Sequence, residues 1–171
     1  MKLPGPPMPR HNLAPGELLI TREPQWIYTL LGSCVAVTMY SPRFQIAAIC
    51  HGMLPRPGRY AAAHACETDP FKYLSCVIPV MTERFRFLGL TPREIEVKMF
   101  GGANVIRLGG APHDERWIGT ANIAAARQLL QAGGFALKAE RVGGGRGCKI
   151  FFNTATGEVL HKPLRGSAPT A

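Results

Sequence analysis

Two apolar segments of strand length, residues 35–40 and 45–53, flank the turn-forming segment Ser41-Pro42-Arg43-Phe44. Serine at the first and proline at the second position are typical of a type I turn, so this stretch predicts a β-hairpin. If the turn centres between its proline and arginine, Cys34 lies directly opposite His51. Directly opposed residues share one face of a sheet, with Cβ atoms about 4.5–5.5 Å apart.

A thiol and an imidazole placed in this way can form the ion pair that activates a cysteine nucleophile. The alternative is structural, because Cys34 can be an ordinary buried residue and His51 a core histidine with a satisfied hydrogen bond. A shift of the register by one residue would place the two side chains on opposite faces. The hairpin therefore predicts a catalytic pair only if its register is preserved.

The chain has 171 residues, of which 46% are apolar and 18% are charged, as is typical of one globular domain with a substantial core. It contains no apolar run of the length of a transmembrane helix, and its first residues lack the apolar segment of a signal peptide. We therefore expect a cytoplasmic protein without direct membrane insertion. In that compartment we expect no disulfide among the five cysteines.

A zinc site and a nucleic-acid surface are two further interpretations that the sequence does not favour. Cys50, His51, His64 and Cys66 follow no familiar spacing of zinc ligands, and the first two point to opposite faces of a strand. The net charge of +9 could attract nucleic acid, but the basic residues are spread along the chain without an aromatic–basic motif. We expect a generally basic surface, no metal and no nucleic-acid partner.

The organisation of the chain predicts three parts. Residues 1–16 are rich in proline and predict a mobile arm, residues 17–165 a single domain, and residues 166–171 a frayed tail. Helical spacing predicts one helix from Asp69-Pro70 to Gly89, bent at Pro79, and a second over residues 121–132, capped by Thr120. The remaining segments read as strands without strict β–α alternation, which predicts an α+β domain.

Three glycine clusters, residues 101–102, 109–110 and 143–147, stand between these elements. A nucleotide-binding loop would need a strand, the GxGxxG pattern and then a helix, whereas residues 143–147 lead into a strand. The clusters fit tight turns or close approaches of the backbone. The other interpretation is that they line a groove for an extended or helical partner.

Five segments, in this order, resemble motifs of the CheD family of chemoreceptor glutamine deamidases. The segments are Leu31–Val37, His51–Pro55, Phe100–Asn104, Ile118–Ile123, and Val142–Gly144 together with Asn153–Val159. The resemblance covers residues 17–163. It implies a layered α/β sandwich with mixed sheets and two main helices, similar to the cytotoxic necrotizing factor-type cysteine deamidases.

The resemblance also implies the chemistry. Cys34 would be the nucleophile and His51 the base in the hydrolysis of receptor glutamine side chains to glutamate and ammonia, without a cofactor. The third catalytic residue would be a threonine shortly before the cysteine, for which Thr29 is the candidate and Tyr28 fills the alternative slot. The backbone N–H of Cys34 is a candidate oxyanion donor.

The implied partners are chemotaxis receptors, through their cytoplasmic helical domain, and a chemotaxis phosphatase of the CheC type. We expect the turn residues Gly32 and Ser33 to bind substrate, together with the basic residues Arg56, Arg59 and Arg146, which would meet an acidic receptor surface. The alternative function is a non-catalytic docking module that binds receptors or the phosphatase.

Overall fold

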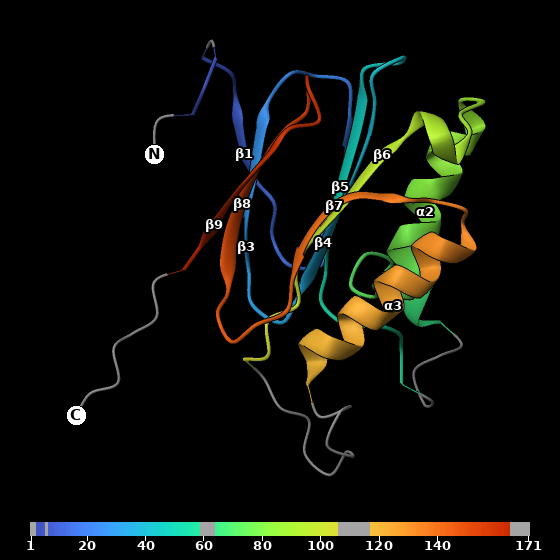
Figure 1. The fold of residues 1–171 in the computed structure, drawn as a ribbon. Helices are drawn as coiled ribbons and strands as arrows, with labels where there is room; N and C mark the ends of the chain where they lie inside the picture. The colour runs from blue at the N-terminus through green and yellow to red at the C-terminus, as the bar shows by residue number, and fades with distance from the viewer. Residues whose placement is uncertain (1–2, 6, 59–63, 106–116, 165–171) are drawn as a thin grey trace.

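The computed structural model describes residues 3–5, 7–58, 64–105 and 117–164. Its elements are β1 (Arg10–Asn12), β2 (Leu18–Thr21), β3 (Trp26–Leu31), β4 (Val35–Ser41), β5 (Ile46–Gly52), α1 (Ala65–Thr68), α2 (Leu74–Phe87), the 3-10 turn η1 (Pro92–Glu94), β6 (Glu96–Gly101), α3 (Ile118–Ala132), β7 (Leu137–Val142), β8 (Cys148–Asn153) and β9 (Val159–Pro163). Figure 1 shows them in three layers, with a sheet on one side, a second sheet in the middle and the helices α2 and α3 on the other side.

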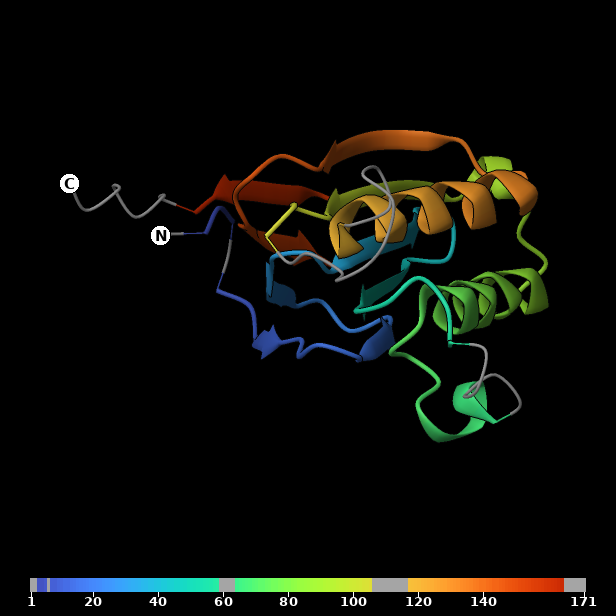
Figure 2. The same ribbon diagram turned by 90° about the horizontal axis from the view of Figure 1, so that it is seen from below.

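Both sheets are mixed. The outer sheet has the order β1-β3-β8-β9, with β1 parallel to β3, and the central sheet has the order β2-β5-β4-β6-β7, with β6 parallel to β7. The helices α2 and α3 cover one face of the central sheet (Figure 2). This arrangement confirms the predicted α+β sandwich with mixed sheets and two main helices.

The central strand β4 has a core on each side, which is why all seven of its residues are buried. Val35, Val37 and Met39 belong to the core between the central sheet and the helices. Ala36 and Tyr40 belong to the core between the two sheets. Because side chains alternate along a strand, those of β4 are divided between two apolar layers. The residues just before Val35 lie at the end of the sandwich where β4 begins.

The β4–β5 hairpin forms, but with a longer loop than predicted. Ser41 pairs with Ile46, so the loop has four residues, and Gln45 has a φ of 47°. The predicted register, with Cys34 opposite His51, is therefore wrong, because Ala36 is the residue opposite His51. The shift is two residues, so Cys34 stays on the face of the sheet that carries His51.

The N-terminal segment also differs from the prediction of a mobile arm. Residues 10–12 form β1, which pairs in parallel with β3, and Leu13 is buried against the inter-sheet core. The Leu13 N–H donates to the Tyr28 carbonyl at 3.0 Å, and the Trp26 N–H donates to the Pro9 carbonyl at 2.9 Å. These bonds pair backbone groups at one edge of β3. The proline content of the segment did not reveal this pairing.

The helix starts differ as well. The helix α2 begins at Leu74 rather than at Asp69-Pro70, because the Lys72 carbonyl accepts from the Met53 N–H and Tyr73 pairs with Leu54. The helix α3 begins at Ile118 rather than after Thr120. Pro79 lies inside α2, and Gly89 follows its end with a φ of 75°.

One disulfide joins Cys66 of α1 to Cys76 of α2, with 5.6 Å between the Cα atoms. The expectation that no disulfide forms is therefore wrong. That expectation rested on an assumed reducing compartment, whereas the fold brings the two cysteines within bonding distance.

Among the described helices, none is long and apolar enough to span a membrane.

Candidate active site

Cys34 and His51 lie at one end of the sandwich, where β4 and β5 stop pairing. Val35 opposite Gly52 is the last pair of the ladder, and Cys34 follows it on the β4 side. Since Ala36 is opposite His51, Cys34 is the diagonal neighbour of His51 on the same face. Diagonal neighbours have Cα atoms about 7–8 Å apart, within reach of long side chains. Cys34 is half-buried, whereas His51 is only 1% exposed.

The imidazole of His51 is held by a chain of two short hydrogen bonds. Thr29 Oγ1 lies 2.7 Å from His51 Nδ1 and 2.7 Å from the Leu13 carbonyl oxygen. The carbonyl can only accept, so the single hydroxyl proton of Thr29 goes to Leu13. The Thr29 oxygen then accepts from Nδ1–H, which leaves the lone pair of the neutral ring on Nε2.

His51 Nε2 is buried and has no hydrogen-bond partner among the described residues. A buried polar atom without a partner is uncommon in folded proteins and requires an explanation. Here the explanation is chemical, because the unpaired atom carries the lone pair of a histidine whose other nitrogen is fixed. This atom can therefore accept a proton from a donor that is brought close to it.

The two groups rest in their neutral forms. Burial lowers the pKa of His51 to about 4, although the Leu13 carbonyl and the charge of Glu17 act in the other direction. Burial also raises the pKa of the Cys34 thiol above its usual value, against the opposing effect of its own backbone N–H. These directions disfavour the preformed thiolate–imidazolium pair that the hairpin suggested, and they favour proton transfer during the reaction.

Of the two candidates for the third position, Thr29 is the one that contacts His51. Tyr28 points to the other side of β3, where its ring stacks on Phe151 with 6.2 Å between the centroids. The alternation along β3 decides this, since Thr29 faces the inter-sheet core with Ile27 and Leu31.

The turn before Cys34 is fixed by backbone hydrogen bonds from the glycine cluster at residues 101–102. Gly102 N–H donates to the Cys34 carbonyl and Ala103 N–H donates to the Gly32 carbonyl, each at 2.8 Å. Gly101 has a φ of 96°, and a Cβ there would collide with the Cys34 carbonyl oxygen. The glycine cluster thus allows its backbone to approach the backbone of the Cys34 turn closely. A role of Gly32 and Ser33 in substrate binding stays a prediction.

Asn122 of α3 is a further residue at this end, and sequence reasoning assigned it no role. It is 0% exposed, and its Nδ2 donates to the carbonyls of Ser33 and Met53, each at 2.9 Å. The only signal for it was its position in the segment 118–123 that resembles a family motif. Leu13 gave no signal at all, because it acts through its backbone carbonyl.

The three predicted docking residues fall in two groups. Arg56 and Arg146 are exposed, while Arg59 lies outside the described residues. Arg56 follows the exit of β5, and Arg146 lies two residues before Cys148, which pairs with Leu31 at the end of β3 next to the Cys34 turn. Their positions are compatible with a docking role, which stays a prediction.

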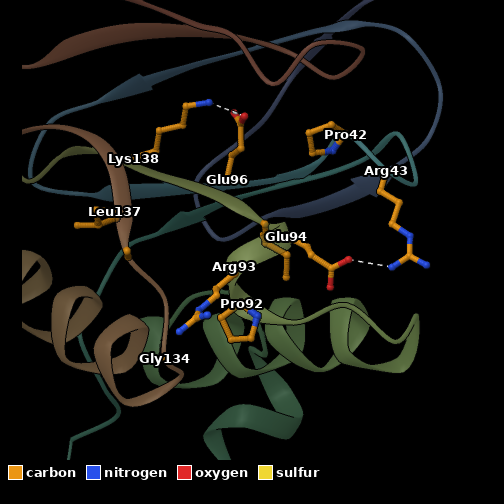
Figure 3. A pocket seen from close by; sticks show the side chains of 11 residues that line it. Pro42, Arg43, Pro92, Arg93, Glu94, Glu96, Gly134, Leu137 and Lys138 are labelled. Atoms are coloured by element: carbon orange, nitrogen blue, oxygen red, sulfur yellow. Dashed lines mark hydrogen bonds and ion pairs between the residues drawn. The ribbon is translucent and has the colours of Figure 1, made fainter.

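The described residues contain no cluster of side chains that could hold a metal ion. One cavity of about 710 Å³ lies at the opposite end of β4 from Cys34, below the β4–β5 loop (Figure 3). Its charged side chains largely neutralise each other, since Arg43 pairs with Glu94 and Lys138 pairs with Glu96. Because the cavity lies at the β4–β5 loop, the length of β4 separates it from the thiol and the imidazole.

Comparison with known proteins gives a consistent match. Residues 53–163 match the family model described as CheD chemotactic sensory transduction. A protein of Geobacter sulfurreducens named "Probable chemoreceptor glutamine deamidase CheD 2" is 42% identical over 159 residues, which cover 93% of this chain and 92% of that protein. A "Probable chemoreceptor glutamine deamidase CheD" of Oleidesulfovibrio alaskensis is 39% identical, over 94% of this chain and 76% of that protein.

Among solved structures, the Bacillus licheniformis hypothetical protein YfiH aligns with 72% of this chain and 49% of its own, at a TM-score of 0.44 and 17% identity. At this level of similarity we infer nothing from the alignment.

Proposed function

This chain belongs to the CheD family, and we propose that Cys34 and His51 carry out its function, the deamidation of glutamine side chains on chemoreceptors. The observation that supports these roles is the state of His51. Its Nδ1 is hydrogen-bonded to Thr29, its Nε2 is buried without a partner, and Cys34 is its diagonal neighbour on the same face.

The proposed reaction begins with proton transfer from the Cys34 thiol to His51 Nε2 as the sulfur attacks the amide carbon of the glutamine. A carbon–sulfur bond forms and the carbonyl oxygen becomes an oxyanion. When the intermediate collapses, the carbon–nitrogen bond breaks, and the proton on Nε2 goes to the nitrogen, which leaves as ammonia. Water then attacks the thioester with His51 as base, and glutamate and the Cys34 thiol are released.

We propose the backbone N–H of Cys34 as one oxyanion donor. This N–H belongs to the residue that carries the attacking sulfur, and its effect on the thiol is to lower the pKa. A donor in the backbone of the nucleophile is close to the carbon that the sulfur attacks, and so it is close to the oxyanion that forms there. The hydrogen bonds from Gly102 and Ala103 hold this backbone segment in place.

Thr29 serves in this proposal as an orienting residue for the base. When Nε2 takes up the proton, Nδ1–H keeps donating to Thr29 Oγ1, so the ring does not need to turn during the reaction. The alternative function, a docking module without catalysis, gives no reason for a histidine with a fixed tautomer beside a half-buried cysteine.

The protein acts in the cytoplasm on the helical domain of chemoreceptors, and Arg56, Arg59 and Arg146 attract that acidic surface. A chemotaxis phosphatase of the CheC type is proposed as a second partner, on the basis of the family resemblance alone. No cofactor is required, because each step uses only side chains, backbone groups and water.

The test is mass spectrometry of receptor cytoplasmic domains that are co-expressed with the protein, to detect the conversion of glutamine to glutamate. We expect conversion with the wild-type protein and none with Cys34→Ala. Cys148→Ala is the matched control, because it removes another thiol and should leave activity intact. Conversion by Cys34→Ala would refute the assigned nucleophile, and no conversion by the wild type on any receptor would refute the function.

A further inference from the structure

We propose that Asn122 is a positioning residue that holds the Cys34 turn and the exit of the His51 strand in register with each other. The inference rests on the proposed function, because it takes Cys34 and His51 as the reacting pair. Asn122 itself does not touch the reacting atoms. It acts through the backbone of Ser33 and Met53, which flank the two catalytic residues in the sequence.

The need for such a residue follows from where the hairpin ends. Pairing between β4 and β5 stops at Val35 and Gly52. If the ladder continued, Cys34 would lie opposite Met53, but the Met53 N–H donates to the Lys72 carbonyl instead. The nucleophile thus lies just beyond the last β4–β5 residue pair that could fix its distance from the base. Small displacements there would lower the rate of a reaction that requires contact between the thiol and the imidazole.

The Asn122 amide takes the place of the backbone pairing that β4 and β5 lack beyond Val35 and Gly52. Its two Nδ2 hydrogens are shared between the Ser33 carbonyl, one residue before Cys34, and the Met53 carbonyl, two residues after His51. The orientation of the amide is fixed by chemistry, because the flipped form would direct Oδ1 at two carbonyl oxygens. Oδ1 is buried and has no hydrogen-bond partner among the described residues. The two bonds from Nδ2 are therefore the only hydrogen bonds of this side chain among those residues.

Asn122 is itself held by the start of α3. Gly119 lies so close to the Gly102 and Ala103 carbonyls that a Cβ would collide with them, and the Thr120 hydroxyl donates to Asn104 Oδ1 at 3.1 Å. The same glycine turn donates hydrogen bonds to the Cys34 and Gly32 carbonyls. The helix, the glycine turn and the Cys34 turn therefore form one interlocked unit, in which the Asn122 amide is the link to the His51 strand.

Two substitutions at Asn122 and one matched control test the role. Asn122→Asp keeps the shape but replaces the donors by an acceptor that faces two carbonyls, and Asn122→Ala removes the group. Asn153→Ala is the control, because Asn153 is also a buried asparagine with a hydrogen bond to backbone, from the Ala155 N–H, and it pairs with Trp26 at the other end of β3. Circular dichroism and urea unfolding give the folded fraction, to which all rates are normalised.

We expect kcat for receptor deamidation to fall by about 10- to 100-fold in both Asn122 variants, with KM within about twofold of wild type. Asn153→Ala should keep kcat close to the wild-type value even if it loses a similar amount of stability. Wild-type kcat per folded molecule in Asn122→Ala and Asn122→Asp would overturn the proposal. Loss of kcat equal to that of Asn153→Ala would overturn it too, because it would show a purely structural role.

A second readout needs no receptor and separates this inference from the proposed function. The alkylation rate of Cys34 by iodoacetamide is measured in the wild type, His51→Ala, Asn122→Ala and the double variant. If Asn122 positions the pair, His51→Ala slows alkylation in the wild-type background but has little further effect in the Asn122→Ala background. Equal slowing by His51→Ala in both backgrounds contradicts the positioning role. If His51→Ala changes nothing in the wild type, alkylation proceeds without help from the neutral imidazole, and the kcat comparison decides the role of Asn122.

Discussion

The Thr29 hydroxyl oxygen lies 2.7 Å from His51 Nδ1, and this hydrogen bond crosses from the outer sheet to the central sheet. Thr29 belongs to β3 and His51 to β5, so the orientation of the base depends on how the two sheets pack. The apolar residues between the sheets, with Phe100, Ile150 and Phe152 among them, therefore also set the orientation of the proposed base.

Removing the Thr29 hydroxyl should impair catalysis more than folding. In Thr29→Val the shape is kept, but Nδ1–H of His51 and the Leu13 carbonyl lose their partner, and the ring is free to change its tautomer. We expect kcat/KM for receptor deamidation to fall by about 10- to 100-fold, as for the loss of a buried hydrogen-bond partner. Thr29→Ser, which keeps the hydroxyl, should retain activity within a few-fold. Equal activity of the valine and serine variants would show that the hydrogen bond is dispensable.

The pH dependence of Cys34 alkylation should report a neutral thiol. Because burial raises the pKa of Cys34 above its usual value, its thiolate fraction should rise by about tenfold per pH unit through the neutral range. Iodoacetamide labelling, located by peptide mass spectrometry, should therefore keep accelerating up to about pH 9. A rate that levels off near neutral pH would instead reveal a preformed thiolate–imidazolium pair. The buried Cys50, whose pKa is raised to about 11, serves as an internal control that should label far more slowly.

Burial of His51 should make the folded protein less stable in mild acid. Its pKa is about 4 in the folded protein and about 6.5 in the unfolded chain, so between these values the unfolded chain binds the proton more tightly. The free energy of unfolding should fall as the pH drops from about 6.5 to 4, by a total of about 3 kcal/mol from this group. Urea unfolding at a series of pH values measures the loss.

His51→Asn is the matched variant for that experiment, because its side-chain N–H₂ can donate to Thr29 but does not titrate. The difference between wild type and variant isolates His51 from the other groups, including His161, whose pKa is also lowered by burial. Parallel pH profiles of the two proteins would mean that His51 is not buried in its neutral form.

Charge reversal near the Cys34 turn should weaken receptor docking without altering the thiol. We expect Arg56→Glu combined with Arg146→Glu to raise KM for receptor by about 3- to 10-fold, since exposed charges contribute modestly and additively. Arg84→Glu combined with Arg86→Glu, on the exposed side of α2, is the control of equal charge change, and it should leave KM unchanged. The increase in KM should shrink as salt is added, while alkylation of Cys34 stays constant. An unchanged KM in the double variant would exclude these arginines from docking.

The number of reactive thiols should reveal the Cys66–Cys76 bond. In denaturant without reductant, a thiol reagent should find the three free cysteines, Cys34, Cys50 and Cys148, and five after reduction. Replacing Cys66 and Cys76 by serine should lower the free energy of unfolding by about 3 kcal/mol, as for the loss of a ring of this size. Finding five thiols before reduction, in protein purified with its thiols blocked, would show that the bond does not form in the cell.

The face shared by Cys34 and His51 could be predicted from the sequence, but their distance could not. Strand alternation survives a shift of two residues, so the longer loop moved His51 to a diagonal position without moving it to the other face. The extra loop residues ended with Gln45 at a positive φ, where glycine or asparagine would have given a signal. Whether Thr29 or Tyr28 contacts His51 was open in the sequence, because it depends on which side of β3 faces the second sheet.

Other features depend on contacts between distant segments, which one sequence does not display. The three residues of β1 have no apolar alternation, and they form a strand because the edge of β3 is available to them. The two carbonyls that Asn122 binds are 89 and 69 residues away in the sequence. Motif resemblance indicated that the segment around Asn122 matters, but only the fold shows that Asn122 reaches both the turn before Cys34 and the end of the His51 strand.

The position of Leu13 gives the first part of the chain an influence on the chemistry. Removal of residues 1–13 would take away β1 and the buried Leu13, while the remaining strands of both sheets, which begin at Leu18, would keep their own pairings. The Thr29 hydroxyl would then have lost its acceptor, and it could turn to donate to Nδ1, which moves the ring proton of His51 to Nε2. In such a truncated protein the histidine would hold its proton on Nε2, the tautomer that cannot accept the proton of Cys34.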